Sequence, residues 1–114
     1  PEQFFISEII REKVYLLFRE EIPYQVAVTI EDFHEKTDDH PTLIEATIHV
    51  DRESQKMMVI GSKGEAVKKV GILARPDIEE LLGQPIYLKL HVKRKYHWRK
   101  QTDFVKHELG YDEE

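Results

Sequence analysis

The chain has 114 residues and a net charge of −5, with 40% hydrophobic and 10% aromatic residues. This length fits one domain with a single modest core. The chain has no cysteine, which excludes disulfides, thiolate metal sites and cysteine nucleophiles and favours a reducing compartment. No apolar run approaches the roughly 18 residues of a membrane-spanning helix. Since Pro1 replaces an initiator methionine and no basic signal region follows it, we expect a piece excised from a longer protein.

The first half of the chain predicts one amphipathic helix and a hairpin of two strands. Residues 5–20 repeat apolar side chains at helical spacing, which predicts a helix capped near Ser7 and stopped by Pro23. Residues 24–31 and 44–51 alternate apolar and polar side chains, as half-buried strands do, with a polar turn over 35–40 between them. We expect an antiparallel hairpin with one wet face.

The second half predicts helix and then strand. Residues 57–60 form a short apolar run whose periodicity fits either a strand or one turn of buried helix. Residues 64–82 have helical periodicity, but Pro76 should kink or divide that helix, and Gly83 should stop it. Residues 86–93 alternate apolar and polar side chains, which predicts a third strand. We expect a short final helix over 103–109.

These elements predict a two-layer α+β fold in one domain over residues 1–114. Strands joined by a helical crossover are normally parallel, so the second and third strands should be parallel neighbours in a mixed sheet of order 1-2-3. Because all three strands alternate, the helices should cover one face only. His49 and His91 then fall on the wet face.

Residues 59–64 read Val-Ile-Gly-Ser-Lys-Gly, a GxxG loop that opens a helix. Two glycines let the backbone turn sharply and approach a nucleic-acid strand, and the free N–H groups of a helix start attract phosphates. Two glycines three apart often mark only a turn, so the loop alone is weak evidence.

The charges are segregated in a way that supports a nucleic-acid partner despite the acidic total. Basic residues crowd 56–75, around the loop, and 89–100, and Glu65 is the one acidic residue in these two windows. Acidic residues fill 31–53 and the last three positions. The alternative is an ordinary solvated surface.

The stretches 54–64 (SQKMMVIGSKG), 71–75 (GILAR), 88–93 (LKLHVK) leading to Trp98-Arg99, and 109–111 (LGY) resemble the C-terminal type II KH domain of the Era family of GTPases. The likeness runs from Phe5 to Tyr111 and implies that residues 54–60 are helical. It also implies a parent protein with an N-terminal GTPase domain that acts in small ribosomal subunit assembly by binding the 3′ region of the small-subunit ribosomal RNA.

The resemblance places GTP and Mg²⁺ in the absent GTPase domain, because this chain has no GxxxxGK[ST] phosphate loop. It implies a cytoplasmic protein that can also lie on the inner face of the cell membrane. We expect no catalysis and no metal in this chain, since its six histidines lack paired ligand spacing and its carboxylates lie in solvated stretches.

A KH domain clamps about four nucleotides of single-stranded RNA at its GxxG loop. Trp98 could stack on a base or pack over the core, and Ile60 and Met57 could form an apolar floor for bases or ordinary core. The alternative function is a KH-shaped protein-interaction or interdomain module without RNA affinity of its own. The predicted RNA-binding residues are Ile60, Gly61, Ser62, Lys63, Gly64, Lys68, Lys69, Arg75, Lys93, Lys95 and Trp98.

Overall fold

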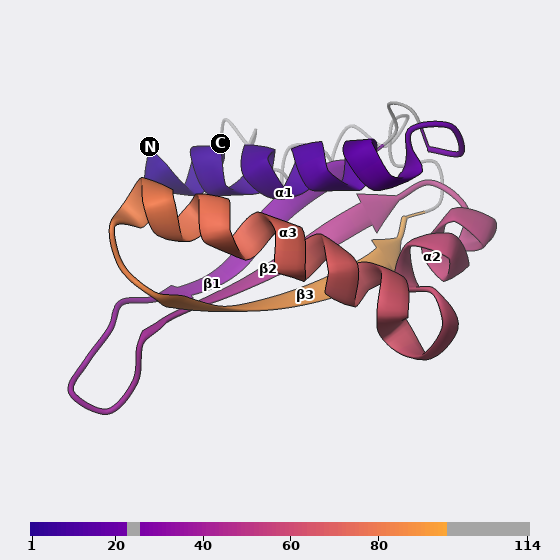
Figure 1. The fold of residues 1–114 in the computed structure, drawn as a ribbon. Coiled ribbons are helices and arrows are strands. Elements are labelled where there is room, and N and C mark those ends of the chain that lie inside the picture. Colours follow the sequence, from indigo (N-terminus) through magenta and orange to yellow (C-terminus); the bar gives the residue numbers. More distant parts are fainter. Residues whose placement is uncertain (23–25, 96–114) are drawn as a thin grey trace, which may run out of the picture.

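Helices and strands follow one another in the predicted order and form two layers (Figure 1). The structure is a computed structural model that describes residues 1–22 and 26–95. Its elements are α1 (Glu2–Phe18), β1 (Ala27–His34), β2 (Thr42–Val50), α2 (Glu53–Ile60), the 3-10 turn η1 (Ser62–Gly64), α3 (Glu65–Leu82) and β3 (Ile86–Arg94).

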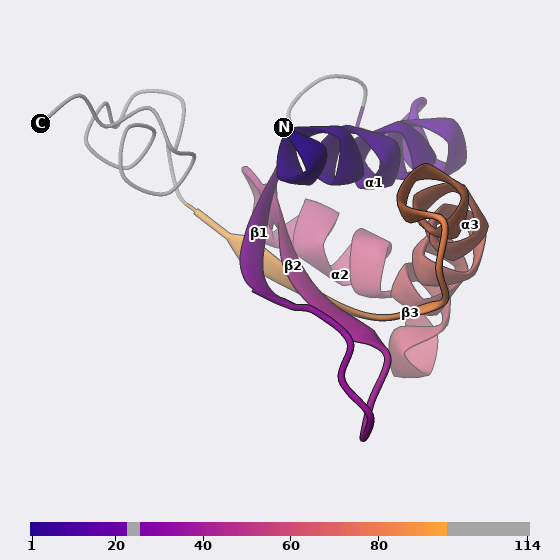
Figure 2. The ribbon, with the colours of Figure 1, turned by 90° about the vertical axis from the view of Figure 1, so that its left-hand side faces the viewer.

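The sheet has the predicted order and directions. β2 is central, antiparallel to β1 and parallel to β3, with Thr42 opposite Ile86 and Val50 opposite Arg94 at the two ends of the parallel ladder. The helices lie on one face of the sheet, as Figure 2 shows. The α+β class and the mixed sheet are therefore confirmed.

The core lies between the helix layer and the sheet. Helical spacing buries Ile6, Ile10 and Val14 of α1, and the two-residue period of β2 buries Ile44, Ala46, Ile48 and Val50. α3 contributes Val70, Ala74 and Ile78. An ion pair of 2.6 Å between Lys13 Nζ and Asp77 Oδ2 joins α1 to α3.

The ends of the first two elements differ from the prediction. α1 begins at Glu2, so Ser7 lies inside it and its hydroxyl donates to the Phe4 carbonyl at 2.7 Å instead of capping the helix. The helix also ends at Phe18, before Pro23, in a turn where the Ile22 N–H bonds the Phe18 carbonyl at 2.7 Å. β1 covers Ala27–His34 and runs past the predicted end, through a β-bulge between Ile30 and Asp32, while positions 24 and 25 of the predicted strand lie outside the described residues.

The face of the hairpin that points away from the core is less exposed to solvent than predicted. Thr47 and His49 alternate outward from the core, yet each is only 1% exposed. β2 is the central strand, so side chains of both neighbouring strands flank it, and the Thr29 hydroxyl lies 2.8 Å from His49 Nε2. Alternation predicted the correct face for these residues but not their burial.

Residues 53–60 and 65–82 form two helices, α2 and α3. Residues 53–60 form helix α2, as the family resemblance implied. Pro76 does not divide α3, which continues from Glu65 to Leu82. The buried residues Val70, Ala74 and Ile78 lie on both sides of the proline, and packing of such a face supplies most helical stability in proteins.

α3 ends at Gly83 as predicted, with the Gly83 N–H bonded to the Glu79 carbonyl at 2.8 Å. The predicted helix over 103–109 lies outside the described residues. No helix among residues 1–22 and 26–95 is long and apolar enough to cross a membrane.

Candidate nucleic-acid interface

The GxxG loop is a tight, internally bonded turn between α2 and α3. Gly61 ends α2 and donates its N–H to the Met57 carbonyl at 2.9 Å. The Gly64 N–H then bonds the Gly61 carbonyl at 3.1 Å. Ser62 and Lys63 are exposed between the two glycines. The loop is therefore held by its own backbone, and its middle faces solvent.

The two glycines of the loop have different surroundings. Both have positive φ, +76° at Gly61 and +75° at Gly64, a conformation that L side chains rarely adopt. A Cβ at Gly61 would lie 2.6 Å from Ala66 Cβ and 2.8 Å from Ala66 N, whereas a Cβ at Gly64 would meet nothing within 4 Å. Gly61 thus permits the close contact of loop and helix, while Gly64 leaves open space at the start of α3.

Lys63 has φ 56° and ψ 27°, and it is the one non-glycine residue with positive φ in the described chain. The left-handed conformation costs a residue with a Cβ roughly 1–2 kcal/mol. Such strain often occurs at functional sites, where surrounding structure maintains it. The hydrogen bond between Gly64 and Gly61 maintains it here.

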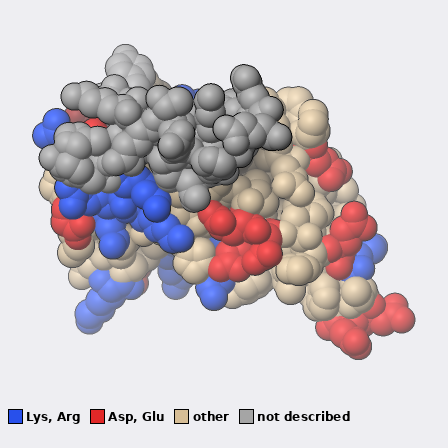
Figure 3. Space-filling model, turned by 180° about the vertical axis from the view of Figure 1, so that it is seen from behind, with Lys and Arg blue, Asp and Glu red and all other residues tan. Residues whose placement is uncertain are grey.

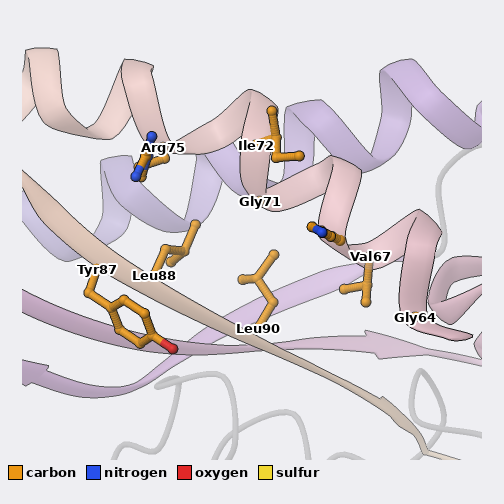
Figure 4. A pocket seen from close by; sticks show the side chains of 9 residues that line it. Gly64, Val67, Gly71, Ile72, Arg75, Tyr87, Leu88 and Leu90 are labelled. Atoms are coloured by element: carbon orange, nitrogen blue, oxygen red, sulfur yellow. The ribbon is translucent and has the colours of Figure 1, made fainter.

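A hollow of about 380 Å³, here called the groove, runs from this loop between α3 and β3 (Figure 4). One wall comes from α3 and the other from β3, which is an edge strand of the sheet. The groove is lined by Gly64, Val67, Lys68, Gly71, Ile72, Arg75, Tyr87, Leu88 and Leu90.

Periodicity explains why these residues meet. Gly64, Lys68, Gly71 and Arg75 follow one another at spacings of four, three and four, which place them on one side of a helix. The alternate residues Leu88 and Leu90 face the helices from β3. The two walls approach each other at Gly71, where an added Cβ would lie 3.7 Å from Leu90 Cδ1, an ordinary contact distance. Leu88 and Leu90 make the floor of the groove apolar.

The cations around the groove have no competing partner. Within residues 1–22 and 26–95, the side chains of Lys63, Lys68, Lys69 and Arg75 make no hydrogen bond or ion pair. Lys68 and Arg75 line the groove, and Lys63 and Lys69 are exposed beside it. Four positive charges spread from the loop to the second half of α3 favour a polyanion.

The remaining predicted RNA-binding residues lie elsewhere. Ile60 is half-buried and Met57 is 61% exposed, and neither lines the groove. Lys93 and Lys95 lie at the far end of β3, where the Lys95 N–H bonds the Val50 carbonyl at 2.9 Å. Trp98 lies outside the described residues.

Sequence reasoning missed most of the groove lining. The missed residues are Val67, Gly71, Ile72, Tyr87, Leu88 and Leu90. The helical spacing from Gly64 to Arg75 could have identified the α3 wall, and alternation could have identified Leu88 and Leu90. Nothing in the sequence indicated Tyr87, because the alternation places it on the other face of β3.

The outer face of the sheet carries mixed charge. Seen from behind, Lys and Arg gather mainly at one end and Asp and Glu over the middle and the other end (Figure 3). The imidazole of His91 contacts the Glu45 carboxylate across the parallel strands and holds the pKa of Glu45 below its ordinary value. Partial burial raises the pKa of Glu31, but the Thr29 and Thr47 hydroxyls and the charge of Lys93 lower it more.

The described part of the chain has no cluster of three or more His, Asp or Glu side chains that could hold a metal ion. His34 Nε2 lies 3.8 Å from Asp32 Oδ1. The His91 imidazole contacts the Glu45 carboxylate, and the buried His49 ring lies beside the Thr29 hydroxyl. These three imidazoles contact other side chains of the sheet.

Comparison with known proteins agrees with this geometry. The model of the KH-domain family matches residues 21–99. The chain is 48% identical over 112 residues to the GTPase Era of Geotalea daltonii, covering 98% of this chain and 37% of that protein. It is 48% identical over 114 residues to the GTPase Era of Staphylococcus haemolyticus, of which it covers 38%.

Two solved structures have the same fold. A variant of Aquifex aeolicus Era bound to GDP and AlF4⁻ aligns with a TM-score of 0.85 at 40% identity, over 93% of this chain and 36% of that one. An Era complex with MgGDPNP and nucleotides 1506–1542 of 16S ribosomal RNA aligns with the same score and identity, over 93% of this chain and 35% of that one. The chain thus spans less than two fifths of the proteins that it matches. It belongs to the KH-domain family and corresponds to the type II KH domain of the Era GTPases.

Proposed function

We propose that this chain binds single-stranded RNA along the groove, with the backbone of the strand at the GxxG loop and its bases on the apolar floor. The supporting observation is that an open loop, an apolar groove and four cations without a partner among residues 1–22 and 26–95 form one continuous surface. Phosphates would meet the cations, while bases would lie on Ile72, Leu88 and Leu90. β3 is an edge strand of the described sheet, so its outer edge would add backbone donors and acceptors for base edges.

The RNA that we propose is the 3′ region of the small-subunit ribosomal RNA. Support comes from the related Era protein whose solved complex contains nucleotides 1506–1542 of 16S ribosomal RNA. We further propose that the parent is a GTP-hydrolysing protein of small-subunit biogenesis, with GTP and Mg²⁺ in its other domain. On this proposal it works in the cytoplasm, with part of it on the inner membrane face, and this KH domain supplies RNA binding rather than catalysis.

The test is a salt titration of binding to an oligonucleotide with the 3′-terminal sequence of a bacterial small-subunit ribosomal RNA. Phosphate contacts give a slope of log K against log salt of roughly −0.7 per contact on single strands. We expect the paired substitution Ser62→Asp, Lys63→Asp to abolish binding while circular dichroism shows an unchanged fold.

The matched control is Lys36→Asp, Thr37→Asp, which changes the charge by the same amount on the exposed hairpin loop. It should bind nearly as well as the unmodified chain. Equal losses in both variants would show that only total charge matters, and no binding by the unmodified chain would favour a protein-interaction module.

A further inference from the structure

The turn that joins α3 to β3 is held by hydrogen bonds from two sides. The Gly83 N–H donates to the Glu79 carbonyl at 2.8 Å, and the Gln84 N–H donates to the same carbonyl at 3.3 Å. On the sheet side, the Gln84 Oε1 atom accepts the Thr42 hydroxyl at 2.7 Å, which connects the turn to β2. The connection between α3 and β3 is therefore fixed to the helix and to the sheet.

The side chain of Glu79 reaches past the turn to the first residue of β3. Its Oε2 atom accepts the Ile86 N–H at 3.0 Å. Ile86 is only 5% exposed and lies opposite Thr42, where the parallel ladder of β2 and β3 begins. A buried backbone N–H requires a hydrogen-bonding partner. The Glu79 carboxylate is that partner for Ile86.

Ile86 directly precedes the residues of β3 that line the groove. Tyr87 and Leu88 are the next two residues along the strand, and Figure 4 shows their side chains across the groove from α3. Glu79 is not one of the lining residues. It belongs to the helix that forms one wall and bonds the first residue of the strand that forms the other wall. Its side chain therefore determines where one wall lies relative to the other.

Loss of the acceptor at position 79 would leave the Ile86 N–H buried without this partner, which costs free energy. The start of β3 can lower that cost by moving outward until the N–H meets water. Tyr87 and Leu88 follow Ile86 in the chain and would move with it. The groove would then lose the shape that it has in the structure.

We propose that Glu79 is a positioning residue for RNA binding, because its carboxylate holds the start of β3 against α3 and so forms the groove before RNA arrives. This proposal rests on the proposed RNA-binding function. A surface that is ordered in advance binds more tightly, since less ordering has to occur during binding. Glu79 acts through Ile86 and needs no contact with RNA.

Two effects of the Glu79 carboxylate on RNA binding have opposite signs. A negative charge beside the groove repels phosphates, so removal of the charge alone should strengthen binding. Removal of the bond to Ile86 should weaken binding. Substitutions at this position therefore separate positioning from electrostatics by the direction in which the affinity changes.

The experiment measures the affinity of each folded variant for the ribosomal RNA 3′-end oligonucleotide. Glu79→Ala removes both the charge and the acceptor and should weaken binding roughly fivefold to tenfold. Glu79→Gln removes the charge but keeps an amide oxygen that can accept the Ile86 N–H, so its affinity should equal or exceed that of the unmodified chain. Glu80→Ala removes an exposed neighbouring carboxylate and is the matched control for charge.

Three further measurements separate position from stability. Thr42→Val removes the hydroxyl that bonds Gln84 without a change of charge, and it should also weaken binding. Ile10→Val removes a buried methylene of α1, outside the groove lining, so it should lower stability and leave the affinity of the folded protein unchanged. Amide hydrogen exchange at Ile86 should be faster in Glu79→Ala than in Glu79→Gln.

Equal affinities of Glu79→Ala and Glu80→Ala would overturn the positioning role of Glu79 while leaving the RNA-binding proposal intact. A loss of affinity in Glu79→Gln as large as that in Glu79→Ala would overturn it as well, because the acceptor would then not be responsible. If the unmodified chain did not bind the oligonucleotide, the proposed function and the positioning role would both fail.

Discussion

At the scale of single residues, the two glycines of the GxxG motif serve different purposes. Gly61 packs against Ala66, so its missing Cβ is a requirement of the fold, while Gly64 borders open space. The motif thus combines one structural glycine with one that leaves open space beside the start of α3.

Alanine at each of these positions separates the two purposes. Gly61→Ala should destabilise the domain by about 2 kcal/mol or more, because overpacking against Ala66 adds to the left-handed strain. Gly64→Ala should cost only the strain, roughly 1–2 kcal/mol, but should weaken RNA binding of the folded protein. Urea unfolding and RNA titration measure the two effects. A Gly64→Ala variant with unchanged affinity would contradict close backbone approach.

The left-handed conformation of Lys63 predicts a gain in stability when it is replaced by glycine. Relief of about 1–2 kcal/mol of strain exceeds the roughly 0.5–1 kcal/mol that a glycine loses in chain entropy. Lys63→Gly should therefore raise the free energy of unfolding by about 0.5 kcal/mol and weaken RNA binding through the lost charge. Lys69→Gly, in the regular helix, should instead destabilise by about 1 kcal/mol. Equal destabilisation in both would show that Lys63 is unstrained.

At the scale of elements, Gly71 sets the space between α3 and β3. A methyl at this position meets Leu90 Cδ1 at 3.7 Å, an ordinary contact. Gly71→Ala should therefore stabilise the helix by roughly 0.5–1 kcal/mol, measured by chemical unfolding.

A larger side chain at the same position should fill the groove. Gly71→Leu should reduce RNA affinity at least tenfold while the domain stays folded, because the added atoms enter the open hollow. Ser54→Leu adds apolar bulk to an exposed position of α2 outside the groove lining without changing the net charge, and serves as the control. Retained affinity in Gly71→Leu would show that bases do not occupy the groove.

Sequence patterns predicted the elements better than the site. The periodicity of the hydrophobic residues predicted the helices and strands, because each element buries one face. The rule that strands joined by a helical crossover are parallel then predicted the order and directions of the strands. They could not predict the burial of His49, which follows from the central position of β2. They also could not predict Tyr87 as a groove residue, since its role depends on β3 being an edge beside α3.

At the scale of the whole molecule, the outer sheet face makes stability depend on pH. The pKa values of Glu45 and Glu31 are lowered in the fold, Glu45 chiefly by His91, and Glu31 by Thr29, Thr47 and Lys93 against the opposing effect of burial. A lowered pKa contributes stability that is present above the unfolded value and is lost as pH falls through the folded value. Thermal melts should show this loss below the ordinary carboxyl pKa of about 4.3.

Glu45→Gln removes the titrating group and should make the acid side of the stability profile less steep. Asp39→Asn, on the exposed hairpin loop, should leave the slope unchanged. A profile that does not respond to Glu45→Gln would show that its contact with His91 contributes no pH-dependent stability.

One side of the molecule has the apolar groove with cations that have no partner among the described residues. On the other side lies the outer face of the sheet, where His91 contacts Glu45. We therefore predict that RNA touches only the first of these surfaces. NMR titration of ¹⁵N-labelled protein with a single-stranded ribosomal RNA 3′-end oligonucleotide measures this residue by residue. We predict amide shifts over residues 61–75 and 87–90 and none over 27–34 of β1, the strand that does not pair with β3. Shifts confined to the outer sheet face, with the loop and groove amides unmoved, would contradict the central claim.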